Sequence, residues 1–178
     1  MKSRIRKFII FDRDGTLINL VPYVSKLSDV IFEKTFDKSM QLLSSTDYSF
    51  AIISNQSAIG RGLASLSEVI AINEYIARRA KIYGVEFLSI LFCPHHPESL
   101  GKCRKPEIGM FQELCNRHKV DVESSYYIGD QDSDFLFAQN SNLNFVPLGN
   151  GFTNRSMSEL RKHSDLYSAI ESIIRNER

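Results

Sequence analysis

Five short apolar runs, each followed at once by polar residues, constrain the fold of this chain more than any other feature. The runs cover residues 8–11, 50–53, 87–92, 126–128 and 144–148. Runs of this length, rich in β-branched and aromatic residues, are typical of strands that are buried on both faces. Stretches with helical periodicity lie between and after them, at residues 30–44, 67–83, 109–119, 132–139 and 166–175. This alternation predicts an α/β fold, a Rossmann-like three-layer sandwich with a central parallel sheet.

The length and charge of the chain limit what such a fold can bind. A chain of 178 residues can bury one substantial core, so we expect a single domain over residues 1–178. Its 22 basic and 21 acidic residues leave a net charge of +1, which provides no long-range field for nucleic acid or an anionic membrane. The apolar run at 8–11 is too short for a signal-peptide core or a membrane span. We therefore expect a cytoplasmic protein, and a monomer, with neither nucleic acid nor membrane as a partner.

Polar segments mark the carboxyl ends of the first four predicted strands. Ligands of parallel sheets bind beyond these strand ends, so the residues there are the candidates for a site. The segments are 12–16 (DRDGT), 54–57 (SNQS), 93–96 (CPHH) and 129–134 (GDQDSD). Little beyond one helix fits between residues 14 and 54, which leaves no room for a large cap. The predicted site is therefore open and the fold capless.

Two carboxylates directly after the first run suggest hydrolysis of a phosphoester. Such an ester repels anions, so its hydrolysis needs a cation and a nucleophile that need not lose a proton. Asp12 can attack phosphorus and form an aspartyl phosphate, which water then hydrolyses. Asp14 can protonate the leaving group and later take a proton from that water. Two acids after a strand are by themselves often a solvated turn, but the Gly15-Thr16 continuation and the later segments favour catalysis.

A third carboxylate indicates a metal ion at the same edge. Asp130 follows the fourth run, and a hard cation held by few carboxylates, phosphate and water is typical of magnesium. Asp134 opens the next predicted helix, where it can orient Lys105 or metal-bound water. Acids at helix starts are also common because they interact favourably with the helix dipole, so both interpretations of Asp134 stay open.

Donors to the phosphate follow from the second segment and from residues 104–105, which lie after the third segment. Ser54 and the backbone amides around Asn55 can donate neutral hydrogen bonds to a phosphoryl group. Lys105 adds a mobile charge, and the planar fork of Arg104 suits a second phosphate or a carboxylate on the substrate.

The chain resembles the haloacid dehalogenase superfamily of phosphatases in four motifs that occur in the same order. They are FDRDGTL, the SNQS turn, a lysine before proline, and GDxxxD. SNQSAIGRG, CPHHP and CRKPEIGM look like one branch, the capless D-glycero-D-manno-heptose 1,7-bisphosphate phosphatases and the related histidinol-phosphate phosphatases. The resemblance covers residues 8–146.

The resemblance implies a role for each matched residue. The implied catalytic residues are Asp12 as nucleophile, Asp14 as acid and base, and Ser54 and Lys105 as holders of the phosphoryl group. The implied magnesium ligands are Asp12, Asp130 and the backbone carbonyl of Asp14. Arg104 would recognise the substrate, and the implied pocket residues are Tyr23, Asn55, Gln56 and Ser57.

The cysteines and one polar residue depart from the branch. An odd number of cysteines, three, argues against a disulfide framework and for free thiols or metal ligands. Cys93, His95 and Cys103 match the zinc loop of the branch, but Gly101 stands where the fourth ligand belongs, and a closed zinc site needs four. Gln131 replaces a lysine that the heptose enzymes usually carry. Cys115 lies at helical spacing with core residues, which predicts a buried thiol.

We therefore expect a magnesium-dependent phosphatase of a small phosphorylated substrate. The resemblance implies D-glycero-D-manno-heptose 1,7-bisphosphate, a precursor in lipopolysaccharide biosynthesis, as the substrate and its 7-phosphate as the group removed. Histidinol phosphate is the alternative substrate, and a non-catalytic phosphate-binding module is the alternative class of function.

Overall fold

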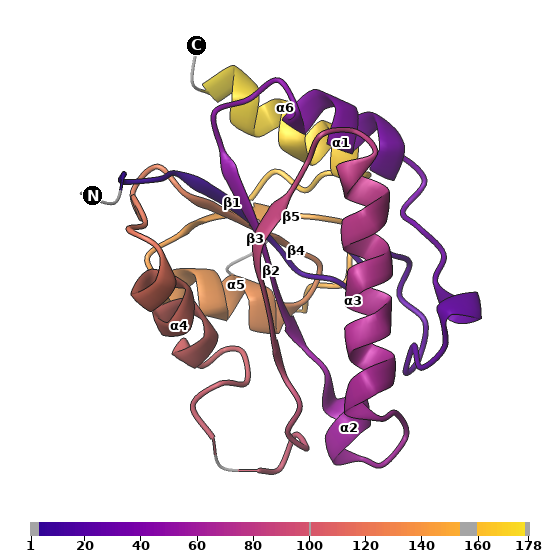
Figure 1. Ribbon diagram of the computed structural model, residues 1–178. Coiled ribbons are helices and arrows are strands. Elements are labelled where there is room, and N and C mark those ends of the chain that lie inside the picture. Colours follow the sequence, from indigo (N-terminus) through magenta and orange to yellow (C-terminus); the bar gives the residue numbers. More distant parts are fainter. Residues whose placement is uncertain (1–3, 100, 154–159, 177–178) are drawn as a thin grey trace.

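A computed structural model describes residues 4–99, 101–153 and 160–176, which form one parallel sheet with helices on both faces (Figure 1). The strands are β1 (Phe8–Phe11), β2 (Ser49–Asn55), β3 (Phe87–Cys93), β4 (Tyr126–Gly129) and β5 (Asn144–Pro147). Their order in the sheet is β3-β2-β1-β4-β5. The chain thus starts in the centre, moves outward to β3 and returns to the other side of β1. The gap beyond β1 and β4 is the switch point where such sheets bind ligands.

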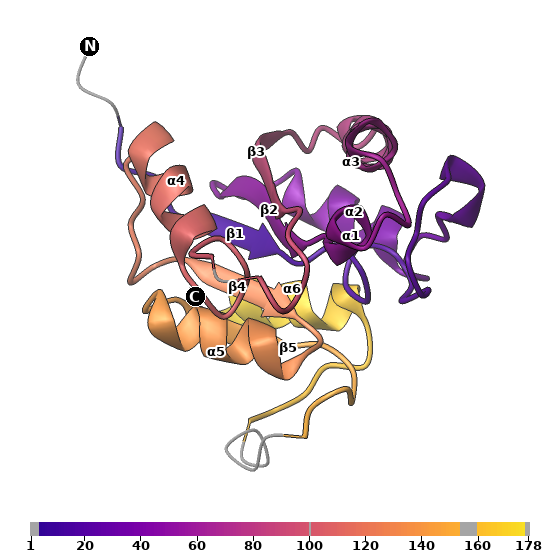
Figure 2. The same ribbon diagram turned by 90° about the horizontal axis from the view of Figure 1, so that it is seen from below.

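The helices form two layers (Figure 2). They are α1 (Phe36–Leu43), α2 (Ser57–Gly60), α3 (Leu66–Lys81), α4 (Gly109–Arg117), α5 (Asp132–Asn140) and α6 (Leu166–Asn176), with a 3₁₀ turn η1 (Leu27–Asp29). Residues of α1, α3 and α6 share one apolar cluster with the sheet, and residues of α4 and α5 share another. The predicted three-layer α/β fold is confirmed.

Strand β1 lies between the two clusters and carries the first candidate segment. Its side chains alternate, so that Ile9 and Phe11 belong to the first cluster and Phe8 and Ile10 to the second. All four are fully buried. The backbone N–H of Asp12 still donates to Ile128 of β4, at 2.9 Å. Asp12 is therefore fixed to the sheet at the point where the strand ends.

The longest helix, α3, shows how the sequence determines these elements. Ser65 accepts a hydrogen bond from the backbone N–H of Glu68 (3.2 Å), and the Glu68 carboxylate accepts one from the N–H of Ser65 (2.7 Å). This capping box satisfies two donors that the first turn leaves free. Ile72, Ile76 and Ala80 then recur at a spacing of four and are buried against the sheet.

One predicted helix is shorter than the sequence indicates. Residues 30–35 of the predicted helix 30–44 are not helical, and α1 begins only at Phe36. Ile18 and Phe32 form an antiparallel bridge, and the N–H of Asn19 donates to the carbonyl of Ile31 at 2.7 Å. The apolar residues there pack as a loop on the first cluster, so the apolar pattern was correct and the helical period was not. The described residues between Asp14 and Ser54 form no cap domain.

The prediction that Cys115 is buried is wrong. Helix α4 buries Met110, Phe111 and Leu114, and Cys115 lies on its exposed side. Among the described residues, no helix combines the length and the apolar character that crossing a membrane requires.

Candidate active site

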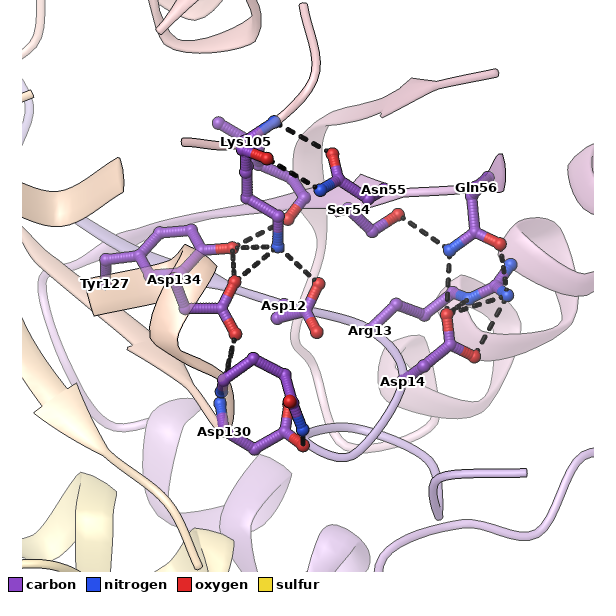
Figure 3. Close-up of polar contacts among 12 residues, drawn as sticks. Asp12, Arg13, Asp14, Ser54, Asn55, Gln56, Lys105, Tyr127, Asp130 and Asp134 are labelled. Carbon is purple, nitrogen blue, oxygen red and sulfur yellow. Dashed lines mark hydrogen bonds and ion pairs between the residues drawn. The ribbon is translucent and has the colours of Figure 1, made fainter. Parts of the chain in front are cut away.

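The predicted site residues that follow β1, β2 and β4 meet at one edge of the sheet, together with Lys105 (Figure 3). Asp12, Asp14, Asn55, Arg104 and Lys105 line a cavity of about 200 Å³ there. The convergence follows from the parallel topology, because parallel strands all present their carboxyl ends to the same edge.

Lys105 is the centre of the hydrogen-bond network. Its Nζ donates to Asp12 Oδ1 (2.7 Å), Asp134 Oδ1 (2.6 Å) and the hydroxyl of Tyr127 (2.7 Å). The residue is only 4% exposed, and all three of its donors are used within the protein. The Tyr127 hydroxyl in turn donates to the carbonyl of Ile53 at 2.8 Å. Lys105 is thus held directly beside the predicted nucleophile.

Burial and charge shift the pKa values of this group. Burial raises the pKa of Asp12 well above its usual range, and the charges of Asp134, Asp130 and Asp14 raise it further against the opposing effect of Lys105. Burial alone would lower the pKa of Lys105, but the charges of Asp12 and Asp134 raise it above its usual value. Lys105 therefore remains charged, and the carboxylates around it gain from any further positive charge.

A divalent cation fits the carboxylates of Asp12, Asp130 and Asp134. One oxygen each of Asp12, Asp130 and Asp134 lies within 4.8 Å of the others. Asp130 Oδ1 is buried without a hydrogen-bond partner, an arrangement that would be costly unless a ligand completes it. Gly15 permits the approach of Asp130, because a Cβ at Gly15 would lie only 2.2 Å from Asp130 Oδ2. Gly15 also has a φ of +86°, a conformation that glycine adopts readily. Carboxylate oxygens are the ligands that hard cations prefer.

Asp14 is held by a buried arginine. Arg13 is 1% exposed and donates from Nε and Nη2 to the two oxygens of Asp14, each at 3.0 Å. Gln56 Nε2 donates to Asp14 Oδ2 at 2.7 Å and Gln56 Oε1 accepts from Arg13 at 2.6 Å. Asn73 of α3 accepts a further bond from Arg13 at 3.3 Å. The predicted acid and base therefore rests in a fixed cradle beside Asp12.

The residues of the SNQS turn have different surroundings. Ser54 is 1% exposed and its Oγ accepts a bond from Gln56 at 3.2 Å. The Asn55 side chain holds the backbone of Lys105 in place. Its Oδ1 accepts a hydrogen bond from the Lys105 N–H (2.9 Å), and its Nδ2 donates one to the Lys105 carbonyl (3.1 Å). Ser57 starts α2 and lines the pocket. Gln56 and Asn55 are thus bonded to other site residues, and their predicted contact with substrate stays a prediction.

A second cavity of about 380 Å³ adjoins the first. Tyr23 and Ser57 line it, and Asp14, Leu20 and Asn55 line both cavities. The pocket thus extends from Asp12 toward the 20–24 loop, as expected for a site that holds more than a phosphate.

The sequence alone did not reveal three residues of the site. Arg13 lies between two acids in the sequence, and Tyr127 lies in an apolar run. Neither position indicates a buried polar contact. Asn73 lies among helical residues, where a buried amide with a 4% exposed side chain has no local signal. Each is polar and buried, which is the property that marks them once the fold is known.

The cysteine loop does not fit a closed zinc site. Cys93 and Cys103 form a disulfide, although the odd cysteine count had argued against one. Their Cα atoms are 5.5 Å apart, the usual separation for such a bond, because the loop returns to β3. His95 Nδ1 lies 3.1 Å from Cys103 Sγ, and Gly101 faces the same histidine without a side chain. Cys93, His95 and Cys103 each offer a ligand atom within 4.8 Å of the others, but a closed zinc site needs four ligands and Gly101 supplies no side chain at the fourth position.

We expect less than one zinc ion per chain in protein purified without chelators. The physical reason is that Gly101 cannot supply a fourth thiolate, so any bound ion lacks the closed coordination of a structural site. Metal analysis of the purified protein measures this directly. A full equivalent of zinc that disappears in Cys103→Ser would contradict the prediction.

Comparison with known proteins places the chain in a family. The sequence model of the family described as "Polynucleotide kinase 3 phosphatase" matches residues 7–148. A probable D-glycero-D-manno-heptose-1,7-bisphosphate 7-phosphatase of Thermoplasma volcanium is 34% identical over 78% of this chain and 96% of that protein. A D-glycero-beta-D-manno-heptose-1,7-bisphosphate 7-phosphatase of Haemophilus ducreyi is 33% identical over 78% of this chain and 80% of its own length.

A solved structure agrees over nearly the whole fold. The D,D-heptose 1.7-bisphosphate phosphatase from B. bronchiseptica, complexed with magnesium and phosphate, superposes with a TM-score of 0.86 at 26% identity. The match covers 96% of this chain and 99% of that one. The chain therefore belongs to the polynucleotide kinase 3 phosphatase family and, within the haloacid dehalogenase superfamily of phosphatases, to the branch of the heptose bisphosphate phosphatases.

Proposed function

We propose that this chain is a magnesium-dependent phosphatase that hydrolyses a small sugar phosphate through an aspartyl phosphate on Asp12. The observation that carries the proposal is the position of Asp12. On one side it accepts a hydrogen bond from Lys105, and on the other it faces Asp130, whose buried Oδ1 has no partner. A carboxylate between a fixed ammonium group and a cation site is suited to attack an anionic phosphorus centre.

The side chains around Asp12 divide the work of the reaction. Asp12 attacks phosphorus, and the positive charge of Lys105 and the hydroxyl of Ser54 stabilise the phosphoryl oxygens as charge moves onto them. Asp14 gives a proton to the leaving oxygen and later takes one from the attacking water. Asp12, Asp130 and the backbone carbonyl of Asp14 would hold magnesium, which supplies charge neutralisation for the phosphate.

The cradle around Asp14 suits the second half of this reaction. Arg13 and Gln56 both donate to the carboxylate and hold it beside Asp12. Hydrolysis of the aspartyl phosphate needs a base at this position to take a proton from the attacking water.

We further propose D-glycero-D-manno-heptose 1,7-bisphosphate as the substrate and the 7-phosphate as the group removed, in the cytoplasmic stage of lipopolysaccharide biosynthesis. The support is the named activity of the relatives together with an open pocket that extends beyond the phosphate position. Histidinol phosphate is the alternative substrate of the same chemistry.

A phosphate-release assay tests this proposal. The purified protein is incubated with heptose 1,7-bisphosphate, histidinol phosphate and p-nitrophenyl phosphate, with magnesium or with a chelator. We expect magnesium-dependent release, with the highest kcat/KM on the heptose bisphosphate. A preference for histidinol phosphate would replace the substrate and keep the chemistry. A lack of release from every ester would indicate a phosphate-binding module instead.

The stabilisation by magnesium is expected to depend on pH. Burial raises the pKa of Asp130 to about 6 in the metal-free protein. Between the ordinary pKa of an aspartate and about pH 6, Asp130 holds a proton in the folded protein that it has released in the unfolded chain. Without metal, the contribution of Asp130 to the free energy of unfolding therefore falls as pH rises through this range. Magnesium must displace that proton, so its affinity should weaken about tenfold per pH unit below this value.

Thermal unfolding with and without magnesium measures the effect. The increase in Tm should be larger at about pH 7 than at about pH 5. An equal increase at both values would show that Asp130 does not titrate against the metal.

A further inference from the structure

The two carboxylate oxygens of Asp130 have different surroundings. Gln131 Nε2 donates a hydrogen bond to Oδ2 at 2.6 Å, whereas Oδ1 is buried and has no hydrogen-bond partner. A buried acceptor without a donor is costly, so the arrangement suits a cation that completes Oδ1. The bond from Gln131 therefore holds the carboxylate in the orientation in which Oδ1 stays available.

The backbone at Asp130 is fixed by the carboxylate of Asp134. The N–H groups of Asp130 and Gln131 both donate to Asp134 Oδ2, each at 3.1 Å. The other oxygen of Asp134 accepts a bond from Lys105 at 2.6 Å. With its backbone held in this way, Asp130 keeps the torsions of its side chain, and these are restrained by the contact with Gln131.

Gln131 also contacts the segment that follows β5. A Cβ at Gly151 would lie 2.6 Å from the carbonyl oxygen of Asp130 and 3.0 Å from Gln131 Nε2, so the backbone of Gly151 packs directly on this amide. The segment is tied to the start of α5, because the N–H and the hydroxyl of Thr153 both donate to the Asp132 carboxylate. The amide of Gln131 thus has fixed neighbours as well as its bond to Asp130.

Gln131 provides its hydrogen bond without adding a charge. Asp12, Asp130 and Asp134 each offer an oxygen to the candidate cation site. Lys105 forms ion pairs with Asp12 and Asp134. When the three carboxylates are ionised, the single ammonium group leaves two negative charges, which match the charge of a divalent cation. A cationic side chain at position 131 would reduce this to one and would repel the metal.

We propose that Gln131 is a positioning residue for the magnesium ion. Its amide bonds Asp130 Oδ2, so that Oδ1 is presented to the cation, and it does so without a charge that competes with the metal. Gln131 acts through Asp130 rather than on phosphorus. The inference rests on the magnesium-dependent function proposed above, and it adds to the metal site a residue that supplies no ligand itself.

Two substitutions test this role. Gln131→Met keeps the volume of the side chain but cannot donate, and Gln131→Asn keeps the amide but is one methylene too short for the bond to Asp130. Each should raise the Kd for magnesium about 10- to 100-fold, the effect typical of losing a hydrogen bond to a metal ligand. The Kd is obtained at about pH 7 on substrate-free protein, from the rise in Tm across a magnesium titration. Gln139→Met, at an exposed position of α5, is the matched control and should bind magnesium like the wild type.

The asparagine variant separates positioning of the metal ligand from helix capping. Gln131 is the N-cap residue of α5, and asparagine is among the most favourable residues at an N-cap. If Gln131 only capped the helix, Gln131→Asn would keep both the metal-free Tm and the magnesium affinity of the wild type. That result would overturn the proposal, whereas weaker magnesium binding by both variants would support it.

The binding measurement also distinguishes this inference from the proposed function, because it needs no substrate. In the phosphate-release assay, the magnesium concentration that gives half-maximal turnover should rise by the same factor as the Kd in both variants. A raised KM for the ester with unchanged magnesium affinity would show that Gln131 contacts the substrate instead, and would overturn its positioning role. A wild-type protein that releases no phosphate, but whose magnesium binding is weakened by both substitutions, would overturn the phosphatase and leave the role of Gln131.

Discussion

Replacing Asp12 with asparagine is expected to lower turnover by about 10⁴-fold or more, the scale seen when a covalent nucleophile is removed. The amide is a poor nucleophile, and the substitution also removes one charge from the cation site. The protein should stay folded, because Lys105 keeps its bonds to Asp134 and Tyr127. Loss of a carboxylate whose pKa is raised by burial removes an unfavourable buried charge. Activity on p-nitrophenyl phosphate and the Tm of the variant give the two measurements.

Two further proteins make the result specific. Asp47→Asn changes an exposed acid at the opposite end of β2 and should keep full activity. Asp14→Asn should slow hydrolysis of the intermediate, so that a good leaving group produces a phosphorylated protein. Mass spectrometry after borohydride reduction should find the label at Asp12. Near-normal turnover of Asp12→Asn, or a label elsewhere, would exclude the covalent mechanism.

Replacing Lys105 with methionine is expected to destabilise the metal-free protein by about 3–5 kcal/mol at neutral pH, the cost of leaving a buried charge without its partner. Lys105 is bonded to both Asp12 and Asp134, and methionine has a similar volume but no donor. Turnover should fall by about 10²- to 10³-fold as well, because a fixed positive charge beside the phosphoryl group is lost. Urea denaturation measures the stability and steady-state kinetics the rate.

The destabilisation should depend on pH with a defined sign. In the variant, the unpaired carboxylates hold protons in the folded state at pH values where the unfolded chain has released them. The loss of stability should therefore shrink as pH falls toward about 5 and grow as pH rises. Lys102→Met, an exposed lysine in the same loop, is the matched control. A Lys105→Met protein with the urea midpoint of the wild type would show that the buried network contributes nothing to stability.

The elements of the fold were largely predictable because buried parallel strands have a local signature. All five apolar runs became strands, within one or two residues at most ends. The predicted helix 30–44 failed at its first half, since Phe32 is apolar for contact with Phe36 and Tyr75 rather than for a helical period. An apolar pattern indicates that a segment is buried. A buried loop and a short buried helix can have the same residue composition, so the pattern does not tell them apart.

The sequence by itself determined which side chains reach the active edge through their position after a strand. Asp12, Ser54 and Asp130 needed no tertiary information, because the carboxyl ends of parallel strands meet. Lys105 follows no strand directly, and it was located by its place before proline in the motif. The cradle of Asp14 was decided only by tertiary structure: Arg13 meets Asn73, 60 residues away, by packing of α3 on the sheet. The end of a parallel strand determines at which edge of the sheet a residue lies. Contacts between distant segments depend on how helices and loops pack on the sheet, which no local sequence pattern encodes.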